Sequence, residues 1–198
     1  GASFARTVTV GSLAYALMIQ GKFEEGEPLW QSAVDDFLLA EAGEESQNLM
    51  SLRFIKAQAY ILNAHPDADE VADDFISKYS DLLGASSPQL LTWNYVLSLS
   101  YFQTNQPDRG LEFANNLYDV IRSNPEVDDT DLYTVAYYES HLARLCLEAD
   151  LTEVALEILE RVLPIIEAEL GGEHEKVIEL KTLLDNAPSA LDQENAPE

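Results

Sequence analysis

The sequence predicts an all-α fold: a right-handed α-solenoid of about four helix–turn–helix units plus a C-terminal capping helix. Between Val10 and Val34, apolar residues recur at the spacing of two amphipathic helices separated by a turn at Gly21-Lys22. No stretch of the chain keeps the alternation of a half-buried strand. The residues that open the inner face of each expected second helix lie 45, 39 and 45 residues apart, at Gly26, Val71, Gly110 and Ala155. This recurrence indicates a repeated unit.

Turn-forming and helix-stopping residues divide the chain into nine expected helices. Proline keeps the residue before it out of the helical region, so His65-Pro66 ends one of them. Pro28 lies in the first turns of its helix, where a missing N–H does least harm, whereas Pro164 lies in a helix interior and predicts a kink. The expected helices cover residues 7–20, 23–40, 46–63, 67–83 (capped by Asp67 or Asp69), 88–104, 108–122, 128–148, 152–170 and 173–185.

The first unit sets the packing that is expected of the others. Small residues at Ala14 and Gly26 let its two helix backbones approach closely, and Ala59, Ser98 and Ala143 are taken as the equivalents of Ala14. A single unit cannot bury its apolar face alone, so neighbouring units are required. That face is formed by Leu13, Ala14, Leu17, Phe23, Gly26, Trp30 and Ala33.

The expected domain organisation is simple. Residues 1–6 are assigned to an N-terminal extension or a cloning remnant, and residues 7–186 to one helical repeat domain. Residues 187–198 are rich in acidic residues and contain proline, so we expect an acidic, flexible tail there.

The first unit resembles a tetratricopeptide repeat (TPR), whose pattern runs W-x2-L-G-x2-Y and continues A-x3-F. Val10 stands where that pattern has Trp, Ala14 where it has Gly, and Gly26 where it has Ala. The interval exceeds the 34 residues of the standard unit and is closer to the longer repeats of kinesin light chains and of bacterial regulators. Residues 167–181, EAELGGEHEKVIELK, are similar to the linker LGxxHP of such repeats, with Glu175 in place of the proline. The resemblance implies a scaffold that binds proteins or peptides.

The charge balance argues against several kinds of partner. The chain has 11 Lys and Arg against 36 Asp and Glu, a net charge of −25, and so offers little basic surface for nucleic acid or anionic membranes. No apolar run approaches the ~18 residues of a membrane-spanning helix. The acidic surface favours either a basic partner or simply solubility, and both interpretations stay open. The sequence assigns no compartment; it slightly favours the cytoplasm and leaves the periplasm open.

The residues that usually carry catalysis do not form a known motif here. His174-Glu175 begins a zinc-protease motif, but Ile178 stands where the second histidine is needed. Cys146 is the single cysteine and lies on an apolar helix face, so an internal disulfide is excluded and a core role is expected. The acidic clusters at Asp67 and Asp128 lack the glycine of a calcium-binding loop. We therefore expect neither an enzyme nor a bound metal or cofactor.

A groove along the first helices of the units is the expected binding site. If Ala14, Ala59, Ser98 and Ala143 are equivalent, one set of side chains lines the concave face, and three of its members are among the chain's eleven basic residues. They would bind an extended or helical peptide that carries a carboxylate. The set comprises Tyr15, Arg53, Lys56, Tyr60, Asn63, Tyr95, Phe102, Tyr137, His141 and Arg144.

Four other interpretations stay open at this point. The basic residues of the groove set can be ordinary ion-pair partners of the abundant acids, with the tyrosines half-packed between helices. A basic partner can instead bind the acidic segments at 24–25, 44–45 and 67–74. The chain can be a regulatory or sensor module of a longer protein with a catalytic or DNA-binding domain. Finally, self-association through the N-terminal unit is expected if its apolar face is uncapped.

Overall fold

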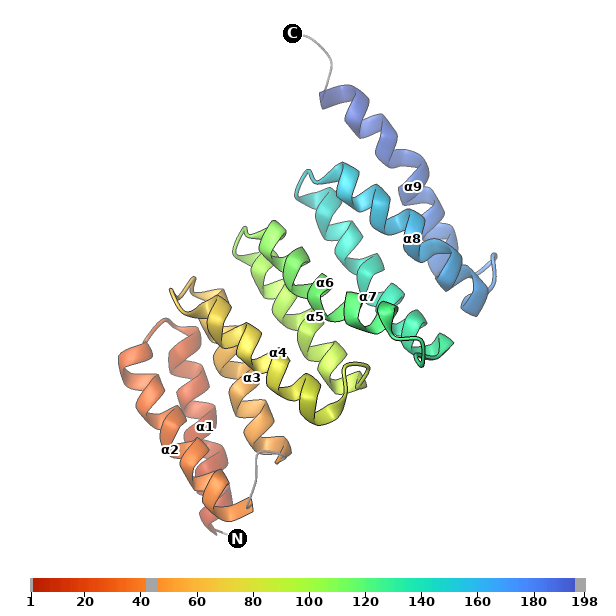
Figure 1. The fold of residues 1–198 in the computed structure, drawn as a ribbon. Helices are drawn as coiled ribbons and strands as arrows, with labels where there is room; N and C mark the ends of the chain where they lie inside the picture. Colours follow the sequence, from red (N-terminus) through yellow and green to blue (C-terminus); the bar gives the residue numbers. More distant parts are fainter. Residues whose placement is uncertain (1, 42–45, 195–198) are drawn as a thin grey trace. The chain divides into compact units, whose positions relative to one another are not determined.

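The computed structural model describes residues 2–41 and 46–194, which form nine α-helices and no strand (Figure 1). None of these helices is long and apolar enough to cross a membrane. The helices are α1 (Ala2–Ile19), α2 (Phe23–Glu41), α3 (Gln47–Leu62), α4 (Ala68–Leu83), α5 (Pro88–Gln103), α6 (Pro107–Ser123), α7 (Asp129–Glu148), α8 (Thr152–Leu170) and α9 (Glu175–Glu194).

Most helix ends lie within one or two residues of the expected ones, and two differ more. α1 begins at Ala2 rather than at residue 7, because residues 3–6 contain neither glycine nor proline to stop it. α9 continues to Glu194 rather than ending at Asp185, so residues 187–194 are helical where a flexible tail is expected. Residues 195–198 of that tail lie outside the described part of the chain. α8 runs as one helix across Pro164, where a kink stays a prediction.

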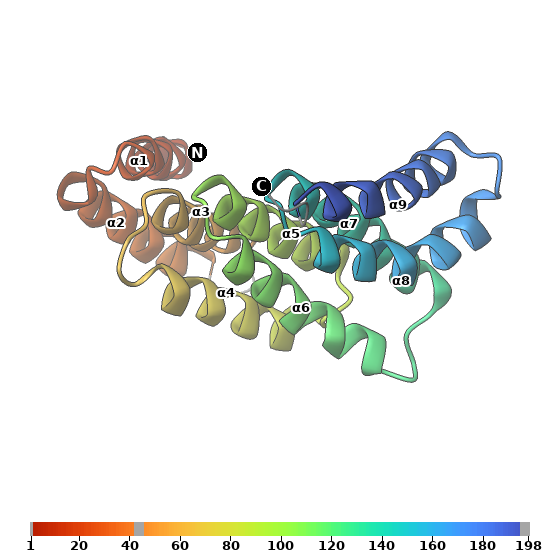
Figure 2. The same cartoon turned by 90° about the horizontal axis from the view of Figure 1, so that it is seen from above.

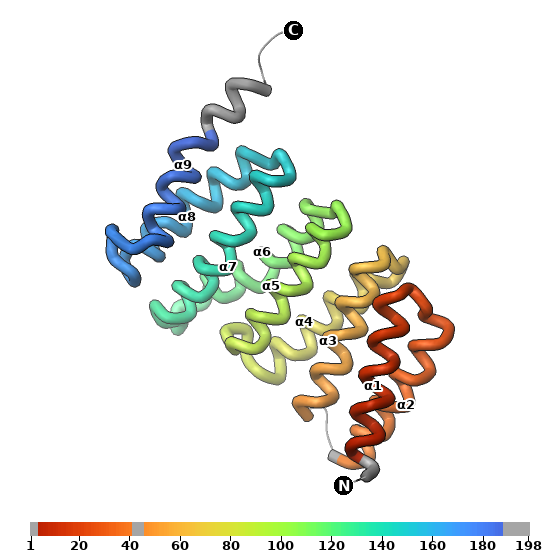
Figure 3. Tube along the Cα trace, turned by 180° about the vertical axis from the view of Figure 1, so that it is seen from behind, coloured from red at the N-terminus to blue at the C-terminus, as the bar shows by residue number. Residues whose placement is uncertain are grey.

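The chain divides into two compact units, residues 1–113 and 114–198, and α6 crosses the boundary. In the first unit, α1, α3 and α5 lie in one layer and α2 and α4 in the other (Figure 2). α3 packs against α1, α2, α4 and α5, and so joins consecutive hairpins. In the second unit, α8 packs against both α7 and α9, and Figure 3 traces these helix pairs along the chain.

The same turn closes the first helix of every pair. A residue with left-handed backbone angles lies two positions after the ends of α1, α3, α5 and α7, at Gly21, Ala64, Asn105 and Asp150. The next N–H donates to the carbonyl five residues earlier, which is the long hydrogen bond of a Schellman motif. These bonds run from Lys22 to Leu17, His65 to Tyr60, Gln106 to Tyr101 and Leu151 to Cys146, at 2.8–3.0 Å.

These turns fix the equivalence of the repeats and correct the one expected from sequence. The left-handed residues lie 43, 41 and 45 residues apart. Seven residues before them lie Ala14, Ala57, Ser98 and Ala143, all fully buried. Ala57, not Ala59, is therefore the equivalent of Ala14. The loop between α3 and α4 has five residues whereas the other three hairpin loops have three, so counting back from Val71 gives a register two residues too late.

Small residues hold the two helices of a hairpin at close range, as expected. A methyl group built on Gly26 would lie 3.1 Å from the Ala14 carbonyl oxygen, and one on Gly110 would lie 3.0 Å from that of Ser98. The Ser98 hydroxyl also donates to the Gly110 carbonyl at 2.7 Å. Because the backbones already touch at these points, there is no room for a larger side chain.

The corrected register explains why the expected inner-face residue Leu13 is exposed. Leu97 and Leu142 occupy the same position in α5 and α7 and are 0% and 1% exposed, whereas Leu13 is 52% exposed. This position faces the preceding helix pair in a stack of repeats. Within the described residues, no helix pair precedes α1. Leu13 therefore has no covering helix among the described residues, whereas its equivalents are buried.

In three of the four hairpins, a polar residue occupies the position that the TPR pattern gives to tryptophan. Val10 holds it in α1, Arg53 in α3, Asn94 in α5 and Glu139 in α7. The buried Glu139 carboxylate accepts hydrogen bonds from Arg122 of α6 at 2.6 Å and from Arg161 of α8 at 2.7 Å. A buried charge is tolerated only when it is paired in this way. The position thus carries polar contacts between helices instead of an aromatic ring.

The close approach within the first hairpin predicts a stability change. A methyl group on Gly26 would lie 2.7 Å from Met18 Cγ as well as against the Ala14 carbonyl. We expect Gly26→Ala to lower the free energy of unfolding by about 1–2 kcal/mol, because overpacking outweighs the gain in helix propensity. Urea unfolding followed by circular dichroism measures this. Ser32→Ala, at an exposed site of α2, is the matched control, and a more stable Gly26→Ala protein would contradict the packing described here.

Candidate functional site

The ten residues expected in one groove are distributed over both compact units. Seven lie in the first unit and three, Tyr137, His141 and Arg144, lie in the second. Within the first unit they do not share one surface. Tyr15 of α1 lies beside one face of α3, whereas Arg53 and Lys56 project from the opposite face of α3. The two surfaces of the first unit are described in turn.

The first surface lies between α1 and α3. The Tyr15 hydroxyl donates to Gln58 Oε1 at 3.4 Å, and Gln58 directly follows Ala57, the corrected equivalent of Ala14. Beside this contact is a hollow of about 280 Å³, and none of the nine residues lining it is charged. Its lining consists of Val8, Gly11, Ser12, Tyr15, Phe37, Asn48, Ser51, Leu52 and Ile55. We call this surface the α1–α3 face.

The second surface lies on the other side of α3, toward α2 and α4. The Lys56 ammonium lies 4.5 Å from the centroid of the Trp30 ring and 5.0 Å from that of Tyr60. The Tyr60 hydroxyl is hydrogen-bonded to the Glu27 carboxylate of α2. Here a cavity of about 480 Å³, which we call the basic pocket, is lined by Trp30, Arg53, Lys56, Val71, Asp74, Phe75, Ser77, Lys78 and Tyr79.

The remaining expected residues of the first unit have packing roles. Asn63 caps the end of α1, since its side-chain amide donates to the carbonyl of Met18 at 3.1 Å and to that of Ala59 at 2.9 Å. The Phe102 ring lies against Gly110, where a methyl group would come within 2.9 Å of it. Tyr95 is half-buried in α5. The contacts of Asn63 and Phe102 thus join neighbouring helices.

The three expected residues of the second unit do lie close together, between α7 and α9. The rings of Tyr137 and His141 make an edge contact with centroids 4.8 Å apart, and Lys176 of α9 lies 5.8 Å from the Tyr137 centroid. Arg144 forms an ion pair with Glu179 of α9. α9 therefore supplies the partner of the cation that the sequence assigns to a peptide carboxylate.

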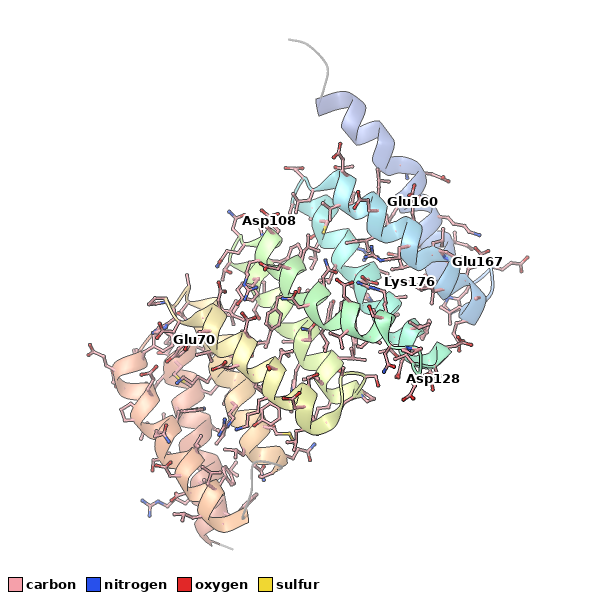
Figure 4. All side chains as sticks on the ribbon, in the orientation of Figure 1. Glu70, Asp108, Asp128, Glu160, Glu167 and Lys176 are labelled. Atoms are coloured by element: carbon pink, nitrogen blue, oxygen red, sulfur yellow. The ribbon has the colours of Figure 1, made fainter. Side chains whose placement is uncertain are left out.

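Each compact unit carries many exposed acidic side chains. Exposed carboxylates such as Glu70, Asp108, Asp128 and Glu160 project from the helices (Figure 4). Many basic side chains are already paired with such groups: Arg109 contacts Asp69 at 3.1 Å and Asp73 at 2.8 Å. Ion pairs also engage Arg122, Arg144, Arg161, Lys176 and Lys181. The basic pocket differs in composition, since three of its nine lining residues are basic and one is acidic.

Sequence reasoning missed the contributions of Trp30, Ser77 and Lys78 to the basic pocket. They come from α2 and α4, which a groove built from first helices leaves out. One signal could have found them: Val71, Asp74, Phe75 and Lys78 recur at helical spacing and so share one face of α4. That face meets Arg53 and Lys56 only when α3 has the register that the turns define.

We next consider metal ligands and the cysteine thiol among the described residues. Among them, no three His, Cys, Asp or Glu side chains are arranged to hold a metal ion. The Cys146 thiol is fully buried in the core of the second unit. Buried thiols of this kind pack as small apolar groups.

The environment of His141 predicts a pH dependence of stability. Burial, reinforced by the nearby charges of Lys176 and Arg144, lowers the pKa of the His141 imidazole below its ordinary value of 6.5. As the pH falls below about 6.5, the unfolded chain therefore binds a proton there before the folded chain does, and the fold loses stability. We expect the stability advantage of the wild-type protein over His141→Gln to shrink between about pH 7.5 and about pH 5.5 in urea unfolding. An advantage that grows over this pH range would contradict the assignment.

Comparison with known proteins identifies the fold. No family model and no curated protein matches the sequence. Two crystal structures match it over 96% of the chain and 88–89% of their own, with a TM-score of 0.56 and 19% sequence identity. Both are from Podosopora anserina and are described as a kinesin light chain with nearly identical TPR-like repeats, one of them as a variant. The chain therefore has a TPR-like fold, a fold that typically binds proteins.

Proposed function

We propose that the chain is a non-catalytic scaffold that binds a peptide segment of a partner protein on its α1–α3 face. The main support for this proposal is the hollow on this face. It is neutral in a chain of net charge −25, and eight of its nine lining residues come from α1 and α3. First helices line the binding groove in repeat proteins. A neutral hollow amid carboxylates is a place where an apolar side chain can be buried without desolvating a charge.

The lining fits a peptide with one apolar anchor. Phe37, Leu52 and Ile55 supply an apolar floor, while Tyr15 and Gln58 bring hydroxyl and amide groups to one edge. Gly11 allows α1 to approach α3 closely, since a methyl group there would lie 2.7 Å from Leu52 Cδ2. An apolar side chain would enter the hollow and the peptide backbone would bond to the polar edge, the arrangement that concentrates binding energy in few residues.

The net charge of the chain bears on which peptides would bind. Because that charge is −25, basic or neutral residues flanking the anchor would be favoured and acidic ones repelled. Such attraction weakens with added salt, whereas burial of the anchor does not. The carboxylate-binding role expected of Arg144 would require its pair with Glu179 to open, and we do not include it in this proposal.

Filling the hollow tests the proposal. Peptides selected from a random dodecapeptide display library on the wild-type protein serve as probes, with affinity measured by fluorescence anisotropy. Ser51→Arg changes an exposed lining residue and places a long charged side chain across the hollow. We expect it to weaken binding of these peptides by about tenfold or more, equivalent to about 1.4 kcal/mol.

Ser32→Arg, at an exposed α2 position outside the hollow, is the matched control and should leave the affinity unchanged. Sedimentation velocity of both variants shows whether self-association through the exposed Leu13 end contributes. Equal affinity of Ser51→Arg and wild-type protein for every selected peptide would contradict the α1–α3 face as the binding site.

A further inference from the structure

A cavity of about 410 Å³ lies within the second unit, where the start of α7 runs beside the end of α8. On each helix the lining residues recur at helical spacing and so share one face. Two of them are acidic and none is basic, and we call this cavity the acidic pocket. Its lining includes Asp129, Leu132 and Tyr133 of α7 and Pro164, Ile165 and Glu169 of α8.

The two carboxylates of the acidic pocket have no cationic partner in the described part of the chain. Neither Asp129 nor Glu169 belongs to any of its ion pairs. The five lysines and arginines of residues 114–198 pair instead with carboxylates outside the pocket. Arg122 and Arg161 pair with Glu139, Arg144 and Lys176 with Glu179, and Lys181 with Glu167. The pocket therefore presents two carboxylates without a counter-charge from this unit.

Tyr133 brings an aromatic ring to these carboxylates. Burial raises the pKa of its hydroxyl above the ordinary value of 10.0, and the neighbouring Tyr137 and Glu169 raise it further. At neutral pH the side chain therefore remains an uncharged phenol that can donate a hydrogen bond. The face of such a ring attracts a cation, and a planar guanidinium can also stack on it. The pocket thus combines charge attraction with a stacking surface.

Pro164 contributes an apolar surface and leaves one backbone carbonyl without its usual helical donor. Proline has no N–H, so the carbonyl of Glu160, four residues earlier, cannot accept the normal hydrogen bond of an α-helix from it. Residues four apart lie on the same face of a helix, so this acceptor lies one turn from the pocket. Leu132 and Ile165 complete the apolar part of the lining with the proline ring. Such a lining suits the aliphatic stem of a charged side chain.

We propose that the acidic pocket binds an arginine side chain of a protein partner. The guanidinium would pair with Asp129 and Glu169, since a carboxylate can accept two parallel N–H bonds from it. Its plane would stack on the ring of Tyr133, and its methylene groups would contact Leu132 and Ile165. The inference rests on the proposed function only in taking the arginine to belong to a protein partner, and it uses no residue of the α1–α3 face.

The composition of the pocket favours arginine over other cations. Within the described residues, no three His, Cys, Asp or Glu side chains are arranged to hold a metal ion. A lysine ammonium is strongly hydrated and acts as a point charge, whereas a guanidinium is weakly hydrated and can bond carboxylates while it stacks on a ring. The net charge of −25 attracts any cation at long range, so a test of the pocket has to compare acids inside it with acids outside it.

Titration of the isotope-labelled full chain with Nα-acetyl-arginine amide, followed by NMR chemical shifts, tests the proposal. Nα-acetyl-citrulline amide is the uncharged counterpart of nearly the same shape. We expect saturable shifts of the backbone amides of Asp129, Tyr133 and Glu169 with the arginine derivative only. Asp129→Asn and Glu169→Gln should each weaken binding by about fivefold, the upper end for an ion pair that water can reach.

Glu157→Gln removes the same charge from an exposed acid of α8 outside the pocket and is the matched control, expected to bind as wild type. Circular dichroism melting shows that each variant is folded. Equal binding of the two derivatives, or equal losses in Glu157→Gln and Glu169→Gln, would overturn the proposal. Undiminished binding in the Asp129→Asn/Glu169→Gln double variant would overturn it as well. Equally tight binding of Nα-acetyl-lysine amide would overturn the assignment to arginine.

These outcomes are separable from those of the α1–α3 face. Library peptides that respond to Ser51→Arg, while the arginine derivative causes no saturable shift, would leave the proposed function standing and reject the acidic pocket. Saturable binding of the arginine derivative that Glu169→Gln weakens, with library peptides that do not respond to Ser51→Arg, would support the acidic pocket and reject the α1–α3 face.

Discussion

Each hairpin depends on a backbone contact between its two helices, which a left-handed turn residue and a small residue seven positions earlier make possible. A methyl group on Gly26 would lie 3.1 Å from the Ala14 carbonyl oxygen, and one on Gly110 would lie 3.0 Å from that of Ser98. The turn determines the direction of the second helix, and the small residues determine how closely it packs against the first. Every surface described for the first unit follows from this contact, because it fixes which side of each first helix faces its partner.

The register of α3 determines which of its side chains face α1 and which face α2 and α4. With Ala57 buried, Gln58 lies beside Tyr15 of α1, whereas Arg53 and Lys56 line a cavity together with residues of α2 and α4. One helix thereby separates a neutral hollow from a cation-lined cavity. In the second unit, the equivalent positions are satisfied internally, since Glu139 pairs with two arginines and Arg144 with Glu179 of α9.

The sequence was sufficient for the helices and for most hairpin contacts, because proline, glycine and helical spacing are local signals. It was insufficient for the register of the second hairpin, since the two extra residues in loop 63–67 do not disturb any local pattern. The groove expected from that register therefore combined Tyr15 with Arg53, Lys56 and Tyr60, which lie on opposite sides of α3. Lys78 and Trp30 were missed for a related reason: their partners are set by packing between pairs, which spacing within one helix cannot report.

The register of α3 is tested most directly by nuclear Overhauser effects between assigned side chains. The account predicts cross-peaks from the Lys56 side-chain methylenes to the Trp30 indole protons, since the Lys56 ammonium lies 4.5 Å from that ring. It also predicts cross-peaks from the Gln58 side-chain amide to the Tyr15 ring. Cross-peaks from Lys56 to Tyr15, with none to Trp30, would contradict the register and the separation of these residues on the two sides of α3.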